Sequence, residues 1–416
     1  MKDVYKYIAV FFILLVIFFS YSVLVSLLPN QKIKKNIVKS IPAMIRADGE
    51  NYPYAIIHKQ EFKLDNFTDA ILLSQNYAID NKKPIASVMN AKFASMPIPG
   101  RMVEALKYQV EHENVYMESY PRYWHGNSFL LRPLLLFADY TFIRWLLYTV
   151  SSILLLVLGI KLHATLGIRK TIAFMLGLFS VNIFVTQFSI HFFTVVILSV
   201  IACILMCKHF KNKRKILLIS FIIGCLTSYF DLLTAPLLTC GLPLIVYLSV
   251  KNEDGFKKGF WTLCSFVVLW GIGYAAIWSS KWTLATILTD NNVFTDAFNT
   301  ISYRTSSEQI SRIMAIKQNY SLLPVVTVNI LLLSLLTLAV LFFNKTRIKT
   351  NLLLLVVAIF PYLWFFVLAQ HSWLHWWFTY RIQAISIIAL FFILINFISW
   401  DKISILFHKL IHKKNI

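Results

Sequence analysis

Long apolar stretches alternate with short polar breaks along most of the chain. A helix needs about 20 predominantly apolar residues to cross the hydrocarbon core of a membrane. By this rule the pattern predicts about ten membrane-spanning helices, near residues 7–28, 141–160, 171–186, 190–207, 215–230, 235–250, 260–279, 322–343, 351–369 and 382–400. The sequence therefore predicts an all-α polytopic membrane protein in which residues 1–416 form a single membrane domain.

Two apolar regions, 171–207 and 215–250, are too long for one helix and tight for two. Polar or helix-breaking residues interrupt them at 187–191 and 231–236, which predicts two helical hairpins. The first apolar stretch follows MKDVYKY, exceeds a typical signal-peptide core in length, and has no small-residue cleavage site after it. We therefore expect an uncleaved first span.

The positive charges predict the orientation in the membrane. Lysine and arginine gather in the segments 161–170, 208–215, 251–258, 344–350 and the C-terminal tail. The breaks at the other end of the predicted bundle together hold one arginine, Arg381; they lie at 187–191, 230–236 and 370–381. By the positive-inside rule, the basic segments and both termini are cytoplasmic in the cell membrane. Two longer loops, 29–140 and 280–321, are then extracytoplasmic, because long loops cross a membrane largely regardless of charge.

Composition supports the membrane class: 58% of the 416 residues are hydrophobic and 14% are charged, against about 45–50% and about 25% in soluble domains. The net charge of +21 would suggest a nucleic-acid partner in a soluble protein. Here the cations stand in short runs between apolar spans, which indicates topology signals and lipid headgroups, so no nucleic acid is expected. The five cysteines lie in or beside apolar spans and are expected to be buried small hydrophobes.

Most acidic side chains are expected outside, and the segment LDNFTDAI of the first outer loop places Asp65 and Asp69 four residues apart. On a helix these carboxylates share one face. Two such groups can bind a divalent cation such as Mg²⁺ or Mn²⁺, or one can act as a general base while the other orients the substrate. The alternative is a solvated helix start with Asp65 as its N-cap.

The segment YPRYWHGNSFLLRP, residues 120–133, sets Arg122, His125 and Arg132 among aromatic side chains. Aromatic rings stack on sugars or line membrane interfaces, and arginine forks bind phosphate. An interfacial anchor for the helix that follows is the alternative, but a histidine and two arginines exceed what anchoring needs. We therefore expect this segment to bind substrate.

Two further groups lie at the outer ends of spans. Asp231 stands in an otherwise apolar setting, where an acid is costly and more often functional than a simple helix cap. The stretch QHSWLHWWFTYR, residues 370–381, combines a tryptophan belt with His371 and His375, which have no clear third metal ligand nearby. Arg381 precedes an apolar span on the side away from most cations, and it suits capture of a lipid phosphate.

The second outer loop contains Asp290, Asp296 and Arg304. Its pattern predicts surface helices that can form a substrate lid, but it does not indicate a particular reaction.

A first span, a long outer loop with acidic residues and surface helices, and then a multi-span bundle resemble the GT-C superfamily of integral membrane glycosyltransferases. The resemblance covers the layout and not a motif, because the first loop holds no adjacent Asp-Glu pair and no Asp-x-Asp. It implies a polyprenyl-phosphate-linked sugar donor and an extracytoplasmic glycan, lipid or protein acceptor. It also implies that Asp65 and Asp69 match the family's acidic pair, and that Arg132 and Arg381 hold the donor phosphate.

We therefore expect a membrane glycosyltransferase of the cell envelope. Its predicted catalytic residues are Asp65 and Asp69, and its predicted substrate-binding residues are Arg122, His125, Arg132, Asp231, His371, His375 and Arg381. One alternative is a polysaccharide polymerase or ligase, although its large loop would more often lie late in the chain. The other is a transporter or flippase of lipid-linked saccharides, although few charges lie within spans and no repeated halves are evident.

Overall fold

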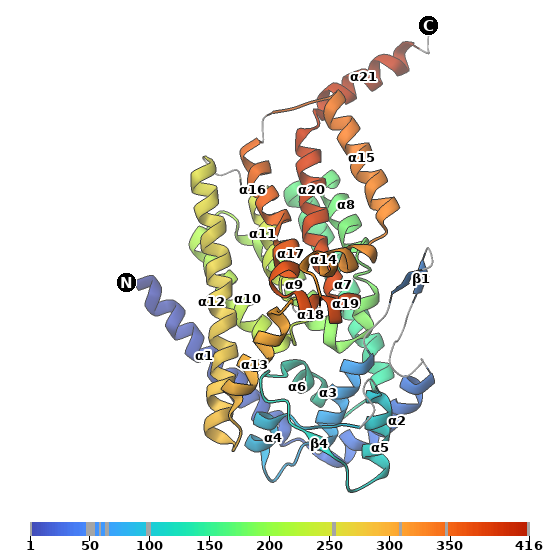
Figure 1. The fold of residues 1–416 in the computed structure, drawn as a ribbon. Helices are drawn as coiled ribbons and strands as arrows, with labels where there is room; N and C mark the ends of the chain where they lie inside the picture. The colour runs from blue at the N-terminus through green and yellow to red at the C-terminus, as the bar shows by residue number, and fades with distance from the viewer. Residues whose placement is uncertain are drawn as a thin grey trace.

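The computed structural model describes residues 2–46, 55–57, 60–62, 66–96, 101–251, 255–307, 310–345 and 348–413. Nearly every element among them is a helix (Figure 1). The exceptions are two small antiparallel hairpins, which pair β1 (Ala55–Ile57) with β2 (Gln60–Phe62) and β3 (Phe93–Ala94) with β4 (Met117–Glu118). The expected all-α class is therefore observed.

Six helical segments are long and apolar enough to cross a membrane. Within the described residues they are Val4–Ser26, Tyr140–Leu166, Ile190–His209, Phe256–Leu288, Ile348–Val367 and Trp376–Phe397. A seventh is possible if α14 (Arg312–Ser321) and α15 (Val325–Leu341), which meet at 87°, form one broken span. The chain is therefore a membrane protein of several spans.

Three of the ten expected spans do not meet these criteria, so the predicted count is not confirmed. Helices α8 (Ile168–Phe179) and α11 (Leu238–Val250) have 12 and 13 residues, and α10 (Lys213–Phe230) begins with three basic residues. Helices are nevertheless present at these places, with breaks near 180–189 and 231–237, where the polar interruptions predicted them. Residues 238–249 of α11 are all buried, as expected for a helix that is apolar on every side.

The bundle is held by close helix packing. Helix α10 lies against α12 (Phe256–Leu288) so tightly that a Cβ on Gly224 would stand 2.1 Å from the carbonyl oxygen of Trp270. Helix α1 (Lys2–Ser26) runs beside α10 in the same direction, because Tyr7 contacts Phe221 and Phe18 stacks on Tyr229. The N-terminal end of α1 therefore lies toward the same end of the bundle as the basic segment 208–215.

Five helices between the first two spans form a unit that we call the cap. They are α2 (Asn30–Arg46), α3 (Asn66–Ala78), α4 (Pro84–Asn90), α5 (Met102–Glu111) and α6 (Gly126–Leu134). The cap gathers at one end of the bundle, opposite the C-terminal helix α21 (Trp400–Lys413) (Figure 1). Helix α2 is amphipathic and buries Ile33, Ile37 and Ile41 in the same core as Leu72 and Leu106 of α3 and α5.

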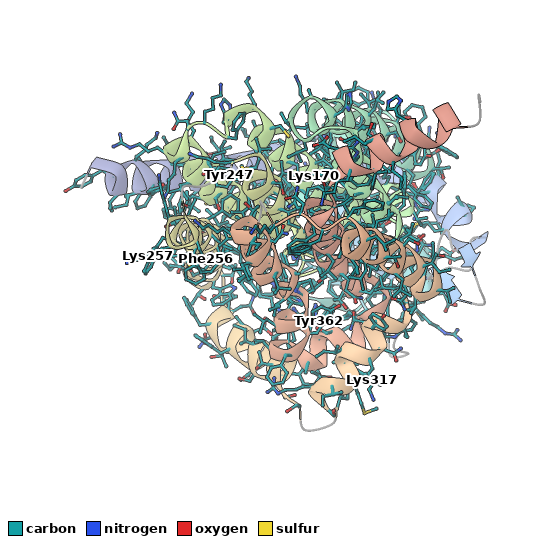
Figure 2. All side chains as sticks on the ribbon, turned by 90° about the horizontal axis from the view of Figure 1, so that it is seen from above. Lys170, Tyr247, Phe256, Lys257, Lys317 and Tyr362 are labelled. Carbon is teal, nitrogen blue, oxygen red and sulfur yellow. The ribbon has the colours of Figure 1, made fainter. Side chains whose placement is uncertain are left out.

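The remaining helices belong to the bundle or lie between it and the cap. Helices α13 (Val293–Thr305), α18 (Ala369–Leu374) and α19 (Trp376–Thr379) lie between the cap and the far end of the bundle (Figure 1). They accompany α7 (Tyr140–Leu166), α9 (Ile190–His209), α16 (Ile348–Ala358), α17 (Phe360–Val367), α20 (Ala384–Phe397) and the 3-10 turns Val185–Phe188 and Tyr380–Gln383. Figure 2 looks onto the end that carries α21, with Lys170 of α8 and Lys257 of α12 among the labelled side chains.

Candidate active site

A network around Arg122 and Tyr123 joins the cap to α12 and α13. The Arg122 guanidinium donates to both carboxylate oxygens of Asp296 at 2.9 and 2.8 Å. The indole N–H groups of Trp278 and Trp282 both donate to the Arg122 carbonyl, at 2.7 and 3.0 Å. Arg304 donates to the buried Tyr123 hydroxyl. Helix α13 is therefore pinned to the cap by two arginines, one from each side.

The turn after α10 carries Asp231, which is 1% exposed. One carboxylate oxygen, Oδ1, accepts from the Thr234 backbone N–H at 2.9 Å, as in a capping turn. The other, Oδ2, is buried and makes no hydrogen bond within the described part of the chain. Burial raises the pKa of Asp231 to about 6. The backbone N–H groups of Leu233 and Ala235 and the Thr234 side chain also face this carboxylate. A buried acid with a raised pKa is a candidate functional group.

Two histidines bind this same turn from other segments. His191, in the first turn of α9, pairs its Nε2 with the Thr234 hydroxyl at 2.7 Å. His371, in α18, pairs its Nε2 with the Leu233 carbonyl oxygen at 2.9 Å. The Nδ1 atoms of both rings are buried and make no hydrogen bond among the described residues. The turn is therefore clamped from both sides, and two ring nitrogens remain for a ligand.

His375 follows His371 by one helical turn, and the two ring centroids lie 4.8 Å apart. Burial lowers the pKa of His375 to about 3 and holds the pKa of His371 well below its ordinary value. The positive charge of Arg304 acts on both rings in the same direction. Both imidazoles are therefore neutral at pH 7 and serve as hydrogen-bonding groups and not as cations.

Arg381 lies behind the histidines in the 3-10 turn after α19. It is 1% exposed, and its guanidinium stands 4.6 Å from the ring centre of Phe192 and 4.9 Å from that of Tyr380. It donates to the Trp377 carbonyl at 2.9 Å and lies near His191. On the other side, Tyr274 of α12 lies near Asp231, Tyr123 and Arg304.

We call this set the junction cluster: Tyr123, His191, Asp231, Tyr274, Arg304, His371, His375 and Arg381. It joins six parts of the chain, at residues 123, 191, 231, 274, 304 and 371–381. Two guanidinium groups, neutral imidazoles and one unpartnered carboxylate can together hold an anionic group and accept a proton from a neighbouring hydroxyl. Of the predicted substrate-binding residues, Asp231, His371, His375 and Arg381 belong to this cluster.

Beside the cluster, a cavity of about 300 Å³ opens on the cap. Tyr120 and Arg122 line its inner side, and Phe67, Phe93 and Arg101 line the rest together with further apolar groups. The Tyr120 ring contacts Tyr123 with centroids 5.5 Å apart, and the Arg122 guanidinium lies 4.7 Å from the Tyr120 ring centre. The cavity therefore reaches the edge of the junction cluster, and Arg122 is one of its lining residues. Its substrate-binding role stays a prediction.

Asp69 occupies a different environment from the one expected for a catalytic base. It is completely buried and accepts hydrogen bonds from the Tyr140 hydroxyl at 2.6 Å, the Ser189 hydroxyl at 2.8 Å and the His191 backbone N–H at 3.3 Å. The Arg144 guanidinium lies 3.5 Å from its Oδ2. Burial raises the pKa of Asp69 against these donors. Both oxygens are engaged, so Asp69 anchors the start of α9 and thereby positions His191.

The other half of the predicted acidic pair, Asp65, lies outside the described residues. Among the residues that are described, no group of three His, Cys, Asp or Glu side chains could hold a metal ion. The cation expected at Asp65 and Asp69, Mg²⁺ or Mn²⁺, therefore stays a prediction from the sequence.

His125 and Arg132 have structural surroundings. His125 bridges the Gln75 side chain (3.2 Å) and the Tyr120 carbonyl (2.8 Å), and burial lowers its pKa to about 3. Arg132 is fully buried and donates to the carbonyl oxygens of Val25 (2.8 Å), Asn76 (3.0 Å) and Leu28 (3.1 Å). Its donors tie the end of α1 to the cap instead of pointing at a phosphate site, so the phosphate role implied for Arg132 does not fit its position.

Sequence reasoning missed four members of the cluster: Tyr123, His191, Tyr274 and Arg304. His191 stands at the edge of the polar break at 187–191, which marked it as a turn residue only. Tyr274 is one aromatic residue within a long apolar span, and no sequence signal distinguishes it. Arg304 was visible as a cation of the second outer loop, but its partner Tyr123 could not be read from the sequence.

No family model matches the chain, and neither a curated protein nor a solved structure matches it. The interpretation of the junction cluster therefore depends on its own geometry and chemistry.

Proposed function

We propose that the chain is a membrane glycosyltransferase that moves a sugar from a polyprenyl-phosphate donor to an extracytoplasmic cell-envelope acceptor. The observation that carries the proposal is the buried, unpartnered Oδ2 of Asp231 in a cluster with Arg304, Arg381 and three histidines. The layout of one span, a helical cap and a multi-helix bundle, which resembles the GT-C superfamily, supports the same assignment.

In this reaction Asp231 accepts the proton of an acceptor hydroxyl. The hydroxyl oxygen then forms a bond to the anomeric carbon of the donor sugar, while the bond from that carbon to the phosphate oxygen breaks. The electron pair leaves with the phosphate, and the guanidinium groups of Arg304 and Arg381 stabilise the charge that develops there. With Asp69 committed to bracing α9, Asp231 is the stronger candidate for the base.

A lipid-linked donor explains where the cluster lies. Arg381 belongs to the segment Trp376–Phe397 and His191 to Ile190–His209, both of which are long and apolar enough to span a membrane. A polyprenyl tail cannot leave the bilayer cheaply, because each buried methylene contributes about 0.8 kcal/mol. The donor phosphate must therefore be bound at the membrane edge, and the acceptor enters from the cavity at Tyr120 and Arg122.

The test is sugar transfer by the full chain in membranes, with a panel of radiolabelled polyprenyl-phosphate monosaccharides and envelope glycans as acceptors. We expect Asp231→Asn to lower the transfer rate about 100-fold or more, the usual contribution of a general base. Asp290→Asn, which changes an exposed acid of the second outer segment, should leave it unchanged. Full activity in Asp231→Asn would refute the base assignment, and movement of an intact lipid-linked sugar across vesicles without a covalent product would indicate a flippase.

A further inference from the structure

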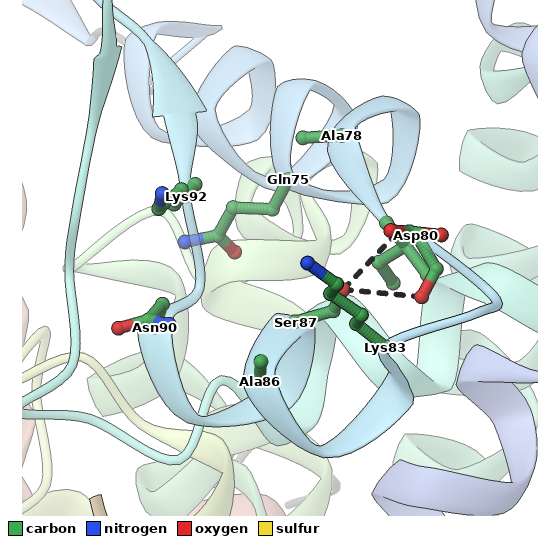
Figure 3. A pocket seen from close by; sticks show the side chains of 9 residues that line it. Gln75, Ala78, Asp80, Lys83, Ala86, Ser87, Asn90 and Lys92 are labelled. Atoms are coloured by element: carbon green, nitrogen blue, oxygen red, sulfur yellow. Dashed lines mark hydrogen bonds between the residues drawn. The ribbon is translucent and has the colours of Figure 1, made fainter. Parts of the chain in front are cut away.

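A second binding region lies on the cap, away from the junction cluster. A cavity of about 190 Å³ is formed by the end of α3, the turn after it and α4 (Figure 3). A larger cavity of about 690 Å³ adjoins it on the other side of Lys92. The two cavities share Ala78 and Lys92 in their linings and therefore lie next to each other on the cap; we call them together the groove.

The smaller cavity is built for a negative charge. Lys83 and Lys92 both line it, and neither ammonium group has a carboxylate or hydrogen-bond partner among the described residues. The one acid beside them, Asp80, uses its Oδ1 to accept from the Lys82 backbone N–H at 2.9 Å. Two unpaired lysines around one small volume attract an anionic group from solution.

The floor of this cavity adds a polar group in need of a partner. Gln75 is 4% exposed, and its carboxamide lies at the centre of the ring of side chains in Figure 3. Its Nε2 donates to the Ala91 carbonyl at 3.3 Å and pairs with His125, whereas its Oε1 makes no hydrogen bond in the described part of the chain. A ligand hydroxyl that reached Oε1 would satisfy a buried acceptor that otherwise costs free energy.

The larger cavity has a different character. Tyr77 lines it, with the Lys34 ammonium 4.6 Å from the ring centre. Gln109 also lines it, and its amide oxygen accepts from the Ser74 hydroxyl at 2.7 Å. Lys92 is shared, so the two cavities together hold three lysines (Lys34, Lys83 and Lys92) and three acids (Asp80, Glu111 and Glu113). The positive excess is therefore confined to the smaller cavity, which has two lysines and one acid. An aromatic side chain beside lysines and glutamates suits the ring and hydroxyl groups of an uncharged sugar.

We propose that this groove binds an acidic oligosaccharide. One carboxylate or phosphate lies between Lys83 and Lys92, and the neighbouring sugar rings continue past Lys92 to Tyr77. A groove of two joined cavities favours a chain over a single free anion or a lipid headgroup. That this oligosaccharide is the part of the acceptor remote from its reacting end rests on the proposed function, in which the reacting end enters the cavity at Tyr120 and Arg122. Gln75 connects the two regions, because it contacts His125, which in turn contacts the Tyr120 carbonyl.

The experiment measures equilibrium binding to the purified full chain in detergent. The probes are a tetrameric oligogalacturonate, a phosphorylated oligosaccharide of equal length, and a neutral dextran oligosaccharide of equal length. We expect one of the two acidic probes to bind more tightly than dextran, and this identifies the anion as carboxylate or phosphate. Replacing Lys83 and Lys92 by glutamine should weaken that binding by about tenfold for each lysine. Lys82→Gln is the matched control, because Lys82 is exposed and does not line either cavity, and it should bind like the parent chain.

Several results would overturn the proposal. These are equal binding of dextran and the acidic probes, no binding of any probe, and unchanged binding in the Lys83/Lys92 double variant. Displacement of the oligosaccharide by inorganic phosphate at equal concentration would mean a free-anion site. Lysine-dependent binding to anionic phospholipid vesicles, without oligosaccharide binding, would mean a lipid headgroup site. Asp231→Asn should keep full binding, so loss of transfer and loss of groove binding are separable outcomes.

Discussion

Replacement of Asp69 by asparagine separates a structural brace from a catalytic base. The carboxylate lies 3.5 Å from the Arg144 guanidinium, and the two side chains are 1% and 5% exposed. An asparagine keeps one acceptor, so the Ser189 hydroxyl can still donate to it. The NH₂ group at the other position meets the Tyr140 hydroxyl, which now donates to Asp69 at 2.6 Å, and Arg144 loses its counter-charge. Removing one partner of a buried ion pair costs about 3–5 kcal/mol.

The assay is thermal unfolding of the purified protein in detergent, followed at a fixed lipid content. We expect Asp69→Asn to unfold on the order of 5 °C below the parent chain. Asp139→Asn is the matched control: Asp139 caps α7 by accepting from the Phe142 N–H at 3.0 Å, and asparagine caps a helix equally well. An Asp69→Asn variant with parental thermal stability but no transferase activity would refute the brace and restore Asp69 as the base.

Three further substitutions test the packing, the ionisation and the cap. Gly224→Ala should destabilise the bundle by about 1–3 kcal/mol, because the new Cβ meets the Trp270 carbonyl, whereas Gly271→Ala meets nothing within 4 Å and should be neutral in the same unfolding assay. The raised pKa of Asp231, about 6, means that the folded chain loses stability as this buried acid ionises. As the pH rises from about 4 to about 6, the melting temperature of the parent chain should therefore fall relative to that of Asp231→Asn. A difference between the two melting temperatures that does not change with pH would contradict the assigned burial. Arg132→Gln should cost about 3 kcal/mol or more, because several buried carbonyls lose a charged donor. Replacing the exposed Arg101 by glutamine should cost less than about 1 kcal/mol. Equal losses of stability in the two variants would refute the role of Arg132 in holding α1 to the cap.

The helical class was readable from the sequence because the length of an apolar run sets whether a helix can cross a membrane. Helix positions at residues 140–166, 190–209 and 256–288 follow the predicted spans closely. The number of spans was less secure. Residues 238–250 are as apolar as a span, yet a short helix suffices there because neighbouring helices bury it. Residues 168–179 form a short helix that buries one face and exposes Ile168, Ile172 and Phe179 on the other. Hydropathy reports that a segment avoids water, and it does not say whether lipid or protein covers the segment.

Some residues of the candidate site could be predicted from the sequence, and the roles of others became clear only from the structure. The sequence alone marked Asp231, His371 and Arg381, because a charged or polar group at the end of an apolar span is costly and therefore informative. Only the tertiary structure decided what Asp69 does, since its donors Tyr140 and Ser189 stand 71 and 120 positions away along the chain. It also decided that Arg132 serves backbone carbonyls and that Asp231 keeps an oxygen without a partner. Hydrogen bonds and burial depend on which distant segments meet, and a one-dimensional pattern carries no distances between them.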